Sequence, residues 1–547
     1  MKATLVALNA HYMHTNLALR QIIKAMPAGD WTAELVEGHI NLPFWDLFTK
    51  VMRTQPDVLG ISCYIWNIDM ALKLARAARQ ARPDLTIFVG GPEVGYRAEE
   101  VLREQPALDW VLTGEGEKSF PMLLEAVQGC RKPQDVPGLC WRDGERVVCN
   151  AQLPPLPPEE WPDVYAEGIK GLEKRLLYIE TSRGCPYKCQ YCLSSAQGRV
   201  RALDARESIR RLSFLAEQGA SIIKLVDRTF NFDVRRAREI WQGLIDHALA
   251  TGVRPTYHFE IGAHLIDEAC LEVLARAPKS LFQFEIGVQT SSEQVLSAIS
   301  RAPSFEKVRR ATVALKALGN IHLHVDLIAG LPGEDIQSFA QSIDDVCEMH
   351  PHKVQLGFLK LLHGSQMRSD APLHHLVFQP DAPYEIISSD KMSFEALCHL
   401  KDVETVMEWF LNSERYPNCI RLLRERLGWY QMFDAMASAF RKAGILDREQ
   451  SEKGRASALM AFMTAQTDKE WARALLSHDL LNAGRRRDLP EELSYEEDDE
   501  LRALLRARFH PVRGQSARRY PVDVLHYEKT GEKRAAECVV IYEARAK

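Results

Sequence analysis

Short apolar segments alternate with amphipathic helical segments along much of this chain. Five apolar runs, bounded by Gly, Pro, Asn or Asp, occupy residues 3–9, 33–38, 58–64, 86–91 and 110–114. Between them, apolar residues recur at three- and four-residue spacing, as in LALRQIIKAM and MALKLARAARQA. Strands that alternate with helices of this length pair in parallel. The alternation therefore predicts a doubly wound, Rossmann-like α/β domain over residues 1–150.

A proline-rich segment divides this alternation into two blocks. Residues 153–165 contain five prolines, which lack a backbone donor and cannot continue a helix or a central strand, so we expect a connector over residues 151–174. Six further strand patterns alternate with helices between residues 175 and 368, which predicts a partial (β/α)6 barrel of the TIM type. Helical patterns dominate residues 369–547, where we expect a mainly helical C-terminal domain.

The composition excludes several classes of protein. With 547 residues, of which 46% are hydrophobic, the chain is long enough for about two to four domains and too apolar for disorder throughout. Its 69 Lys and Arg residues nearly balance 74 Asp and Glu residues, so nucleic acid is not an expected partner. No stretch approaches the ~18–20 uninterrupted apolar residues of a membrane span. We therefore expect a cytoplasmic protein without membrane contact.

Three of the twelve cysteines are clustered. Cys185, Cys189 and Cys192 form a CxxxCxxC pattern directly after the predicted strand LLYIET. Three thiolates on one loop can bind a soft-metal centre, and a [4Fe–4S] cluster held by three of them leaves one iron open to an exogenous ligand. A structural zinc site would need a fourth ligand. The other nine cysteines, Cys140 and Cys149 among them, are expected to be core or surface thiols, since disulfides are rare in the cytosol.

The cysteine segment resembles the signature of the radical S-adenosylmethionine (SAM) enzymes, CxxxCxφC, in which φ is aromatic and is here Tyr191. The resemblance implies that the three cysteines bind a [4Fe–4S] cluster whose open iron binds the amino and carboxylate groups of SAM. It also implies that an electron from the cluster cleaves SAM to methionine and a 5′-deoxyadenosyl radical.

Later barrel strands carry further segments that resemble this family. Residues 227–231 resemble the place where the family holds the methionine end of SAM, which implies cofactor-binding roles for Asp227, Thr229, Phe230 and Asn231. GVQT at 287–290 resembles the segment near the ribose and implies Gln289, and DLIAGLPGE at 326–334 resembles the motif beside the adenine and implies Gly330. Taken singly, each could be an ordinary turn or a satisfied residue of the barrel interior.

A doubly wound domain directly before such a barrel resembles the cobalamin-binding architecture of one large subgroup of radical SAM enzymes. Ligands of such sheets lie beyond the carboxyl ends of the strands, and small residues there let the backbone approach a corrin ring. The predicted strand ends carry the implied cobalamin-binding residues Asn9, Ser62, Gly90, Gly91, Gly114, Glu115 and Gly116. None of the 17 histidines lies in a DxHxxG motif. His11 is either a loop residue or a substitute ligand, and a flavodoxin-like domain without cofactor is the alternative.

Several charged residues have two interpretations. Arg183 and Lys188 flank the cysteines and either offset the charge of a cluster or are ordinary solvated residues. His258 and Glu260 share one face of the third barrel strand because strand side chains alternate. These two residues, and Glu285 on the next strand, point either into the barrel or into its shell of helices.

The resemblance implies an enzyme that most commonly transfers a methyl group from methylcobalamin to an unactivated carbon or a phosphinate. Alternatives are cobalamin-dependent radical rearrangement or cyclisation, methylthiolation through a second cluster, and a non-catalytic corrinoid sensor or carrier. The N-terminal cysteines lack the compact spacing that methylthiolation needs. We expect a small-molecule or peptide substrate and an electron donor such as flavodoxin or ferredoxin. The C-terminal region resembles an additional domain of unknown function found in some cobalamin-type members.

Overall fold

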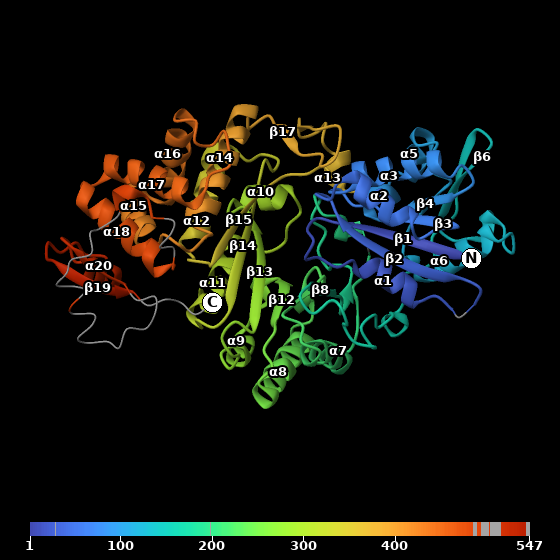
Figure 1. The fold of residues 1–547 in the computed structure, drawn as a ribbon, viewed down its shortest axis with the longest axis horizontal. Coiled ribbons are helices and arrows are strands. Elements are labelled where there is room, and N and C mark those ends of the chain that lie inside the picture. Colours follow the sequence, from blue (N-terminus) through green and yellow to red (C-terminus); the bar gives the residue numbers. More distant parts are fainter. Residues whose placement is uncertain (28, 197, 485–488, 494–502, 504–515, 543–547) are drawn as a thin grey trace.

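The computed structural model describes residues 1–547 except 28, 197, 485–488, 494–502, 504–515 and 543–547. Three regions follow one another along the chain: a sheet with flanking helices, a second sheet with helices, and a group of helices (Figure 1). The doubly wound sheet, the partial barrel and the mainly helical C-terminal region predicted from the sequence are confirmed. Within the described residues, no helix is long and apolar enough to cross a membrane.

The N-terminal region is built on a seven-stranded sheet in the order β2-β1-β3-β4-β5-β6-β7. The first five strands pair in parallel, in the order of a flavodoxin-like sheet, which places a ligand site at the carboxyl ends near β1 and β3. Its elements are β1 (Lys2–Asn9), α1 (Leu17–Lys24), β2 (Thr32–His39), α2 (Phe44–Met52), β3 (Val58–Ser62), α3 (Ile68–Ala81), β4 (Thr86–Gly90), α4 (Pro92–Gly95), α5 (Ala98–Glu104), β5 (Trp110–Leu112), α6 (Gly116–Val127), β6 (Leu139–Asp143) and β7 (Arg146–Cys149).

The hairpin of β6 and β7 was not predicted, and it corrects the expectation for two cysteines. Cys140 and Cys149 lie opposite each other on these antiparallel strands, with their Cα atoms 4.1 Å apart, and form a disulfide. They are nine positions apart in the sequence, a spacing without a recognised motif. The pairing depends on the hairpin register, which places the two side chains on the same face of the sheet.

The central region is a six-stranded, all-parallel sheet in the order β15-β14-β13-β12-β11-β8. Consecutive strands are neighbours, as in a barrel that has not closed. Its elements are β8 (Leu176–Ile179), β9 (Ser182–Arg183), β10 (Arg201–Ala202), α7 (Ala205–Glu217), β11 (Ile222–Leu225), α8 (Val234–Thr251), β12 (Thr256–Ile261), α9 (Glu268–Leu274), β13 (Phe282–Gln289), α10 (Glu293–Ala298), α11 (Phe305–Ala317), β14 (His322–Ala329), α12 (Ile336–Cys347) and β15 (Lys353–Phe358).

The barrel strands bury alternate residues against the helices. On β13, Phe282 and Phe284 are fully buried, and the Phe284 ring lies 5.5 Å from that of Trp241 on α8. Gln283 and Glu285, between and after them, are only half-buried. Because side chains alternate across a strand, the polar residues face the barrel interior.

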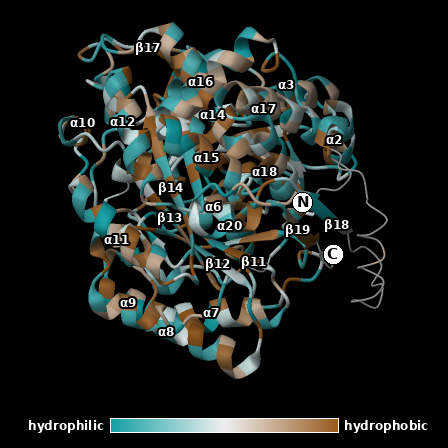
Figure 2. Ribbon diagram, turned by 90° about the vertical axis from the view of Figure 1, so that its left-hand side faces the viewer, coloured by the Kyte–Doolittle hydropathy of each residue, from teal (hydrophilic) through white to brown (hydrophobic). Residues whose placement is uncertain are grey.

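The C-terminal region shares one continuous hydrophobic core with the barrel. Trp429 Nε1 donates to Glu348 at 2.7 Å and the Tyr430 amide donates to Asp344 at 2.7 Å, which attaches the region to the barrel beside α12. Its helices carry both hydrophilic and hydrophobic residues (Figure 2). The remaining elements are α13 (Gln366–Ser369), β16 (Val377–Phe378), β17 (Ile386–Ser388), α14 (Phe394–Phe410), α15 (Pro417–Leu427), α16 (Trp429–Lys442), α17 (Glu452–Gln466), α18 (Lys469–Asn482), β18 (Ser516–Tyr520), α20 (Val524–Thr530) and β19 (Cys538–Tyr542).

Candidate functional site

The three clustered cysteines lie on the loop that follows β8 at the carboxyl end of the barrel. Cys189 is buried, and Cys185 and Cys192 are half-buried. Sγ of Cys185 is 3.5 Å from Oγ1 of Thr229, which follows β11. The structure thus brings Thr229, predicted to lie near the methionine end of SAM, next to a predicted cluster ligand.

Asp227 anchors the start of this loop. Its carboxylate is fully buried and accepts hydrogen bonds from the Thr181 amide at 2.7 Å, the Thr181 hydroxyl at 2.6 Å and the Ser182 hydroxyl at 2.6 Å. Hydrogen bonds to an ionised acceptor are strong. The structure therefore gives Asp227 a role that the sequence did not predict, that of fixing the chain where it leaves β8.

Arg301, which follows α10, is a site residue that sequence reasoning missed. One guanidinium nitrogen lies 3.6 Å from Sγ of Cys189 and 3.1 Å from the hydroxyl of Tyr191, and another donates to the Gly287 carbonyl. Burial raises the pKa of the Cys189 thiol, and the charge of Arg301 opposes that rise. A single arginine in the segment AISRAPS carries no spacing signal, so only the fold identifies it.

The cysteine loop has the donor set that a [4Fe–4S] cluster requires. Among the described residues, no group of three or more His, Cys, Asp or Glu side chains is arranged to hold a metal ion. A [4Fe–4S] cluster does not require its ligands to converge on a single metal ion, because each protein thiolate binds a different iron atom. Three thiols on one loop, with a buried guanidinium beside one of them, fit such a cluster.

Phe230 and Asn231 connect the ends of β11 and β12. The Phe230 ring is fully buried, 4.4 Å from that of Phe259 and 5.7 Å from that of Trp241. The Asn231 side chain donates to the Gly262 carbonyl at 3.0 Å and accepts from the Gly262 amide at 2.8 Å. Both residues thus hold neighbouring strand ends in register beside the cysteine loop.

Gln289 and Gly330 lie at the carboxyl ends of β13 and β14. Gln289 has a left-handed backbone with φ of +74°, and its Oε1 is buried without a hydrogen-bond partner. Gly330 has φ of +85°, and a Cβ there would lie 2.9 Å from Cγ2 of Ile386. A ligand hydroxyl or amine at this edge would satisfy Oε1 of Gln289 by donating a hydrogen bond to it.

The barrel interior holds a network of charged side chains. Glu285 on β13 accepts from Lys224 on β11 at 3.0 Å and pairs with His258 on β12 at 2.8 Å. Glu260 lies 3.8 Å from Arg228. These contacts settle the question left open by the sequence, since His258, Glu260 and Glu285 all face the interior.

Carboxyl groups in the interior have very different acidities. Burial would raise the pKa of Glu285, but His258 and Lys224 bring it down to about 2. Burial raises the pKa of Glu260 to about 7. Burial and the charges of Glu285 and Glu260 raise the pKa of Asp326 on β14 to about 8, and its Oδ1 has no hydrogen-bond partner. The interior therefore contains both an ionised and a protonated carboxyl group at neutral pH.

Glycines form the carboxyl edge of the first sheet. Gly91 is exposed with φ of +110°, and a Cβ there would lie 2.5 Å from the Cys63 carbonyl oxygen. At Gly90 a Cβ would lie 3.1 Å from the Leu112 carbonyl oxygen. The strand ends therefore approach too closely for larger residues at Gly91, and the backbone remains accessible to a large planar ligand.

Two further glycines of the predicted cobalamin site differ in their surroundings. Gly114 is exposed with φ of +80°, and a Cβ there would lie 3.0 Å from Oε1 of Gln152. Gly116 begins α6, and a Cβ there would lie 2.8 Å from Cδ1 of Ile22 on α1. Helix packing therefore explains Gly116 without a ligand, whereas Gly114 leaves exposed backbone at the sheet edge.

Asn9 and Ser62 end β1 and β3 at the same edge, and both are buried. The Asn9 side chain donates to the His14 carbonyl at 2.9 Å, and the Ser62 carbonyl accepts from the Asn67 side chain at 3.0 Å. Both residues shape the loops after their strands. His11 lies in the first of these loops and is exposed.

Arg183 connects the two sheets. Its guanidinium pairs with Glu115 at 3.2 Å and Glu117 at 2.5 Å from the first region, and with Glu180 at 2.6 Å from the barrel. It also lies 4.7 Å from the ring of Trp161 in the proline-rich connector. Arg183 is thus neither solvated nor paired with a cysteine, and Glu115 lies at the interface between the regions.

The loop after β1 covers the edge strand of the barrel. The Leu176 amide of β8 donates to the Met13 carbonyl at 2.8 Å, and the Thr15 hydroxyl donates to the Leu176 carbonyl at 3.1 Å. The carboxyl edge of the first sheet is therefore fixed directly against the barrel.

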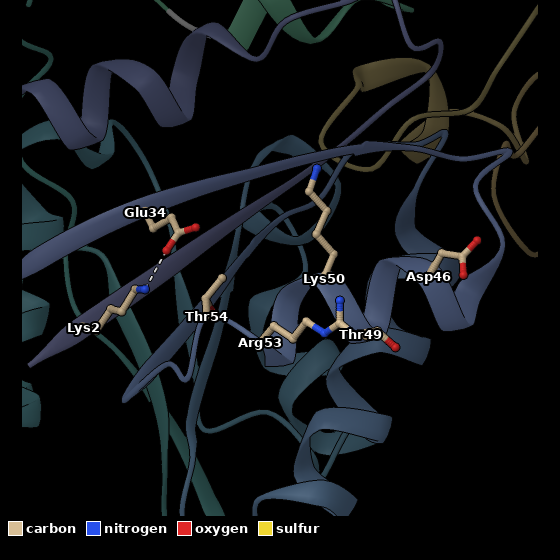
Figure 3. Close-up of a pocket in the computed structure, with 7 residues that line it drawn as sticks. All are labelled: Lys2, Glu34, Asp46, Thr49, Lys50, Arg53 and Thr54. Carbon is tan, nitrogen blue, oxygen red and sulfur yellow. Dashed lines mark ion pairs between the residues drawn. The ribbon is translucent and has the colours of Figure 1, made fainter.

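A surface pocket of about 540 Å³ lies elsewhere in the first region. It is lined by residues of β1, β2 and α2, among them Lys2 and Glu34, which pair at 2.6 Å (Figure 3). Lys2 begins β1, whereas Asn9 ends it. The pocket thus lies at the end of the sheet opposite the predicted site.

Three family models match this chain. The B12 binding domain matches residues 3–124, the radical SAM superfamily matches residues 179–346, and a family of proteins of unknown function, DUF4080, matches residues 373–516. These matches coincide with the first sheet, the barrel with its cysteine loop, and the C-terminal region.

Two curated relatives are similar to part of the chain. The 2-(S-pantetheinyl)-carbapenam-3-carboxylate methyltransferase of Streptantibioticus cattleyicolor is 29% identical over 323 residues, which are 55% of this chain and 46% of that protein. The cobalamin-dependent radical SAM methyltransferase TokK of Streptomyces tokunonensis is 26% identical over 331 residues, again 55% of this chain and 46% of that protein. The chain thus spans about half the length of these relatives.

One solved structure extends the similarity of fold over most of the chain. The cobalamin-dependent SAM radical enzyme OxsB, with aqua-cobalamin and SAM bound, has a TM-score of 0.61 at 16% identity, covering 92% of this chain and 83% of that one. At this identity the likeness shows the fold alone. The likeness of fold agrees with the three family matches: the part of the barrel that matches the radical SAM superfamily, residues 179–346 with the cysteine loop, lies between the B12-binding match and the DUF4080 match.

Proposed function

We propose that this protein is a cobalamin-dependent radical SAM methyltransferase that acts on a small-molecule or peptide substrate. The observation that carries the proposal is the position of the cysteine loop, which Arg183 ties to Glu115 and Glu117 at the carboxyl edge of the first sheet. Two predicted cofactor edges thereby lie next to each other. We propose domain limits at residues 150, 174 and 368.

In this proposal Cys185, Cys189 and Cys192 hold a [4Fe–4S] cluster, with Tyr191 and Arg301 beside it. A cluster held there with SAM would supply reductive cleavage of SAM, and cobalamin held at the edge of the first sheet would supply a methyl group. The chain itself fixes the cysteine loop through Asp227, and the unpaired acceptor of Gln289 is available for a ligand hydroxyl.

Cobalamin would lie against Asn9, Ser62, Gly90, Gly91, Gly114 and the adjoining Glu115 and Gly116. The exposed backbone of Gly91 and Gly114 offers a surface without side chains to a corrin ring or its nucleotide tail. The absence of a DxHxxG motif from the sequence leaves no standard histidine for cobalt.

The substrate would enter the polar barrel interior, where Glu260 and Asp326 are available for hydrogen bonds. We propose methylation of an unactivated carbon or a phosphinate, in line with the methyltransferases among the relatives. A low-potential donor such as flavodoxin or ferredoxin would supply the electron. A reducing cytoplasm would suit the free thiols of the cysteine loop.

The test is anaerobic reconstitution of the full chain with iron, sulfide and hydroxocobalamin, followed by SAM and a chemical reductant. We expect bound cobalamin, iron–sulfur absorbance, and formation of 5′-deoxyadenosine and S-adenosylhomocysteine. Cys189→Ala is expected to abolish the iron–sulfur absorbance and 5′-deoxyadenosine, whereas the exposed Cys130→Ala serves as a matched control.

Two results would overturn the proposal. Cleavage of SAM by Cys189→Ala at the wild-type rate would remove the cluster from the reaction. Failure of the reconstituted wild-type chain to retain cobalamin would remove the methyl donor. Formation of 5′-deoxyadenosine without S-adenosylhomocysteine would favour radical rearrangement or cyclisation instead.

A further inference from the structure

Residues 359–388, here called the bridging segment, leave β15 and run across to the B12-binding domain. The segment contains α13, β16 and β17, and Figure 1 shows α13 beside the helices of the N-terminal region. It doubles back on itself, because the Leu361 amide donates to the Tyr384 carbonyl at 2.9 Å and the Ile386 amide donates to the Leu359 carbonyl at 2.9 Å. Its second arm belongs to the DUF4080 match.

Tyr384 makes the central contact with the B12-binding domain. Its hydroxyl donates to Oε1 of Glu93 at 2.5 Å, and the two residues are 2% and 5% exposed. Glu93 lies on α4, directly after Gly90 and Gly91 at the end of β4, and it also pairs with Arg97 at 3.0 Å. A buried hydrogen bond to a charged group is among the stronger single contacts in a protein.

The bridging segment holds the Tyr384 ring in place from several sides. The Arg368 guanidinium lies 4.7 Å from the ring, and the His363 ring packs edge-on at 4.9 Å. Tyr384 has a φ of +55°, which is uncommon for a residue other than glycine. A backbone strained in this way persists only where the surrounding structure fixes it, and here it directs the hydroxyl towards Glu93.

The same segment contacts both predicted SAM-binding edges of the barrel. The Met367 amide donates to the carbonyl of Gln190, between two of the cysteine ligands, at 2.9 Å. Ile386 packs against Gly330 at the end of β14. The bridging segment is therefore joined to the cysteine loop, the adenine-side motif and the edge after β4.

We propose that Tyr384 is a positioning residue which, by anchoring Glu93, fixes the glycine-rich edge of the B12-binding domain relative to the cysteine loop. The first residues of the DUF4080 domain then complete the cobalamin site. This inference rests on the proposed function, since it assumes that cobalamin binds at the edge after β4. It assigns a role to a domain that matches a family of unknown function.

The test compares Tyr384→Phe with Tyr416→Phe in the full chain, reconstituted with cluster and hydroxocobalamin. Tyr416 is a matched control, because it is fully buried in the same domain and donates to Glu452 at 2.6 Å. We expect Tyr384→Phe to lose cobalamin roughly ten-fold faster on dilution, about the effect of one hydrogen bond to a charged group. Iron content and iron–sulfur absorbance should match the wild type in both variants.

A second measurement needs no cofactor. In the cofactor-free protein, hydrogen exchange of the backbone amides in residues 90–97 should accelerate in Tyr384→Phe and remain unchanged in Tyr416→Phe. Glu93→Ala should also lose cobalamin faster, and the double variant should lose it no faster than Glu93→Ala alone, because Tyr384→Phe then has no contact with Glu93 left to remove.

The outcomes separate this inference from the function on which it rests. If the wild type retains cobalamin and Tyr384→Phe releases it at the rate of Tyr416→Phe, the inference is wrong and the proposed function stands. If the wild type retains none, both are wrong. Additive effects of the Tyr384 and Glu93 substitutions would show that the two residues act separately, which also contradicts the inference.

Discussion

The two parallel sheets of this molecule use their faces differently. On β1 of the first sheet, Leu5 packs into the apolar cluster beneath α1 and α6, and Leu8 packs into the cluster beneath α2 and α3. On β13 of the barrel, Phe284 packs against α8, whereas Gln283 and Glu285 face a polar interior. One sheet is apolar on both sides and the other on one side only.

This difference determines where each sheet can carry chemistry. A sheet covered on both faces can present a ligand only with its strand ends and loops, so exposed glycines such as Gly91 and Gly114 form its predicted site. A barrel with a polar interior presents side chains along the strands themselves, such as Glu285 and Asp326. Arg183 joins the predicted cofactor edges of the two sheets, and the barrel also has ionisable side chains beneath its edge.

The largest effect is expected from a comparison of the two faces of β13 by their contribution to the free energy of unfolding. Phe284→Ala should lower the free energy of unfolding by about 3–5 kcal/mol, because it leaves a cavity beside Trp241. Gln283→Ala, one residue earlier on the interior face, should cost under about 1 kcal/mol, because it removes only long polar contacts. Urea denaturation of the cofactor-free chain measures both. Equal losses would show that the interior is packed like a core.

The first sheet should lack this asymmetry. Leu5→Ala and Leu8→Ala lie on opposite faces of β1, and both side chains are almost completely buried. Each substitution should lower the free energy of unfolding by about 2–5 kcal/mol, since each deletes the same buried atoms. The same denaturation experiment applies. A loss confined to one of the two leucines would contradict the two-sided core.

A smaller effect is expected at the edge of the first sheet. Gly91→Ala places a Cβ 2.5 Å from the Cys63 carbonyl oxygen in a left-handed backbone, which should cost about 1–3 kcal/mol of stability. Gly95→Ala is the control, because nothing lies within 4 Å of its Cβ position. We expect Gly91→Ala also to weaken cobalamin retention in the reconstituted chain. Equal stability of the two variants would show that the edge tolerates a side chain.

Sequence patterns predicted the strands of both sheets well, because burial on one or both faces requires apolar residues at regular positions along each strand. The prediction that Cys185, Cys189 and Cys192 hold a cluster also came from the sequence, because their spacing is local. Sequence patterns did not identify Arg301, Glu117 or Tyr384, since each reaches its partner through the fold. Tyr384 is 291 residues from Glu93. The same limit applies to the Cys140–Cys149 disulfide, which depends on an unpredicted hairpin register.

The last comparison distinguishes two carboxyl groups of the barrel interior by the sign of their pH dependence. Asp326 has its pKa raised from the ordinary Asp value to about 8 by burial and by Glu285 and Glu260. The folded state therefore holds a proton that the unfolded chain releases near pH 4, so this contribution to stability is present at low pH and is lost as the pH rises towards about 8. Glu285 has its pKa lowered to about 2 because His258 and Lys224 outweigh its burial, so its contribution is present above about pH 4.5 and is lost as the pH falls towards 2.

Denaturation of the wild type and two variants between pH 3 and pH 8 separates these contributions. Relative to Asp326→Asn, the wild type should lose stability as the pH rises from about 4 to about 8; relative to Glu285→Gln, it should lose stability as the pH falls below about 4.5. Parallel curves for wild type and variants would show that the two carboxyls share one environment. Curves of opposite slope would instead show that one polar interior holds a proton at Asp326 and a negative charge at Glu285 at neutral pH. The first sheet cannot do this between its strands and helices, because apolar clusters cover both of its faces.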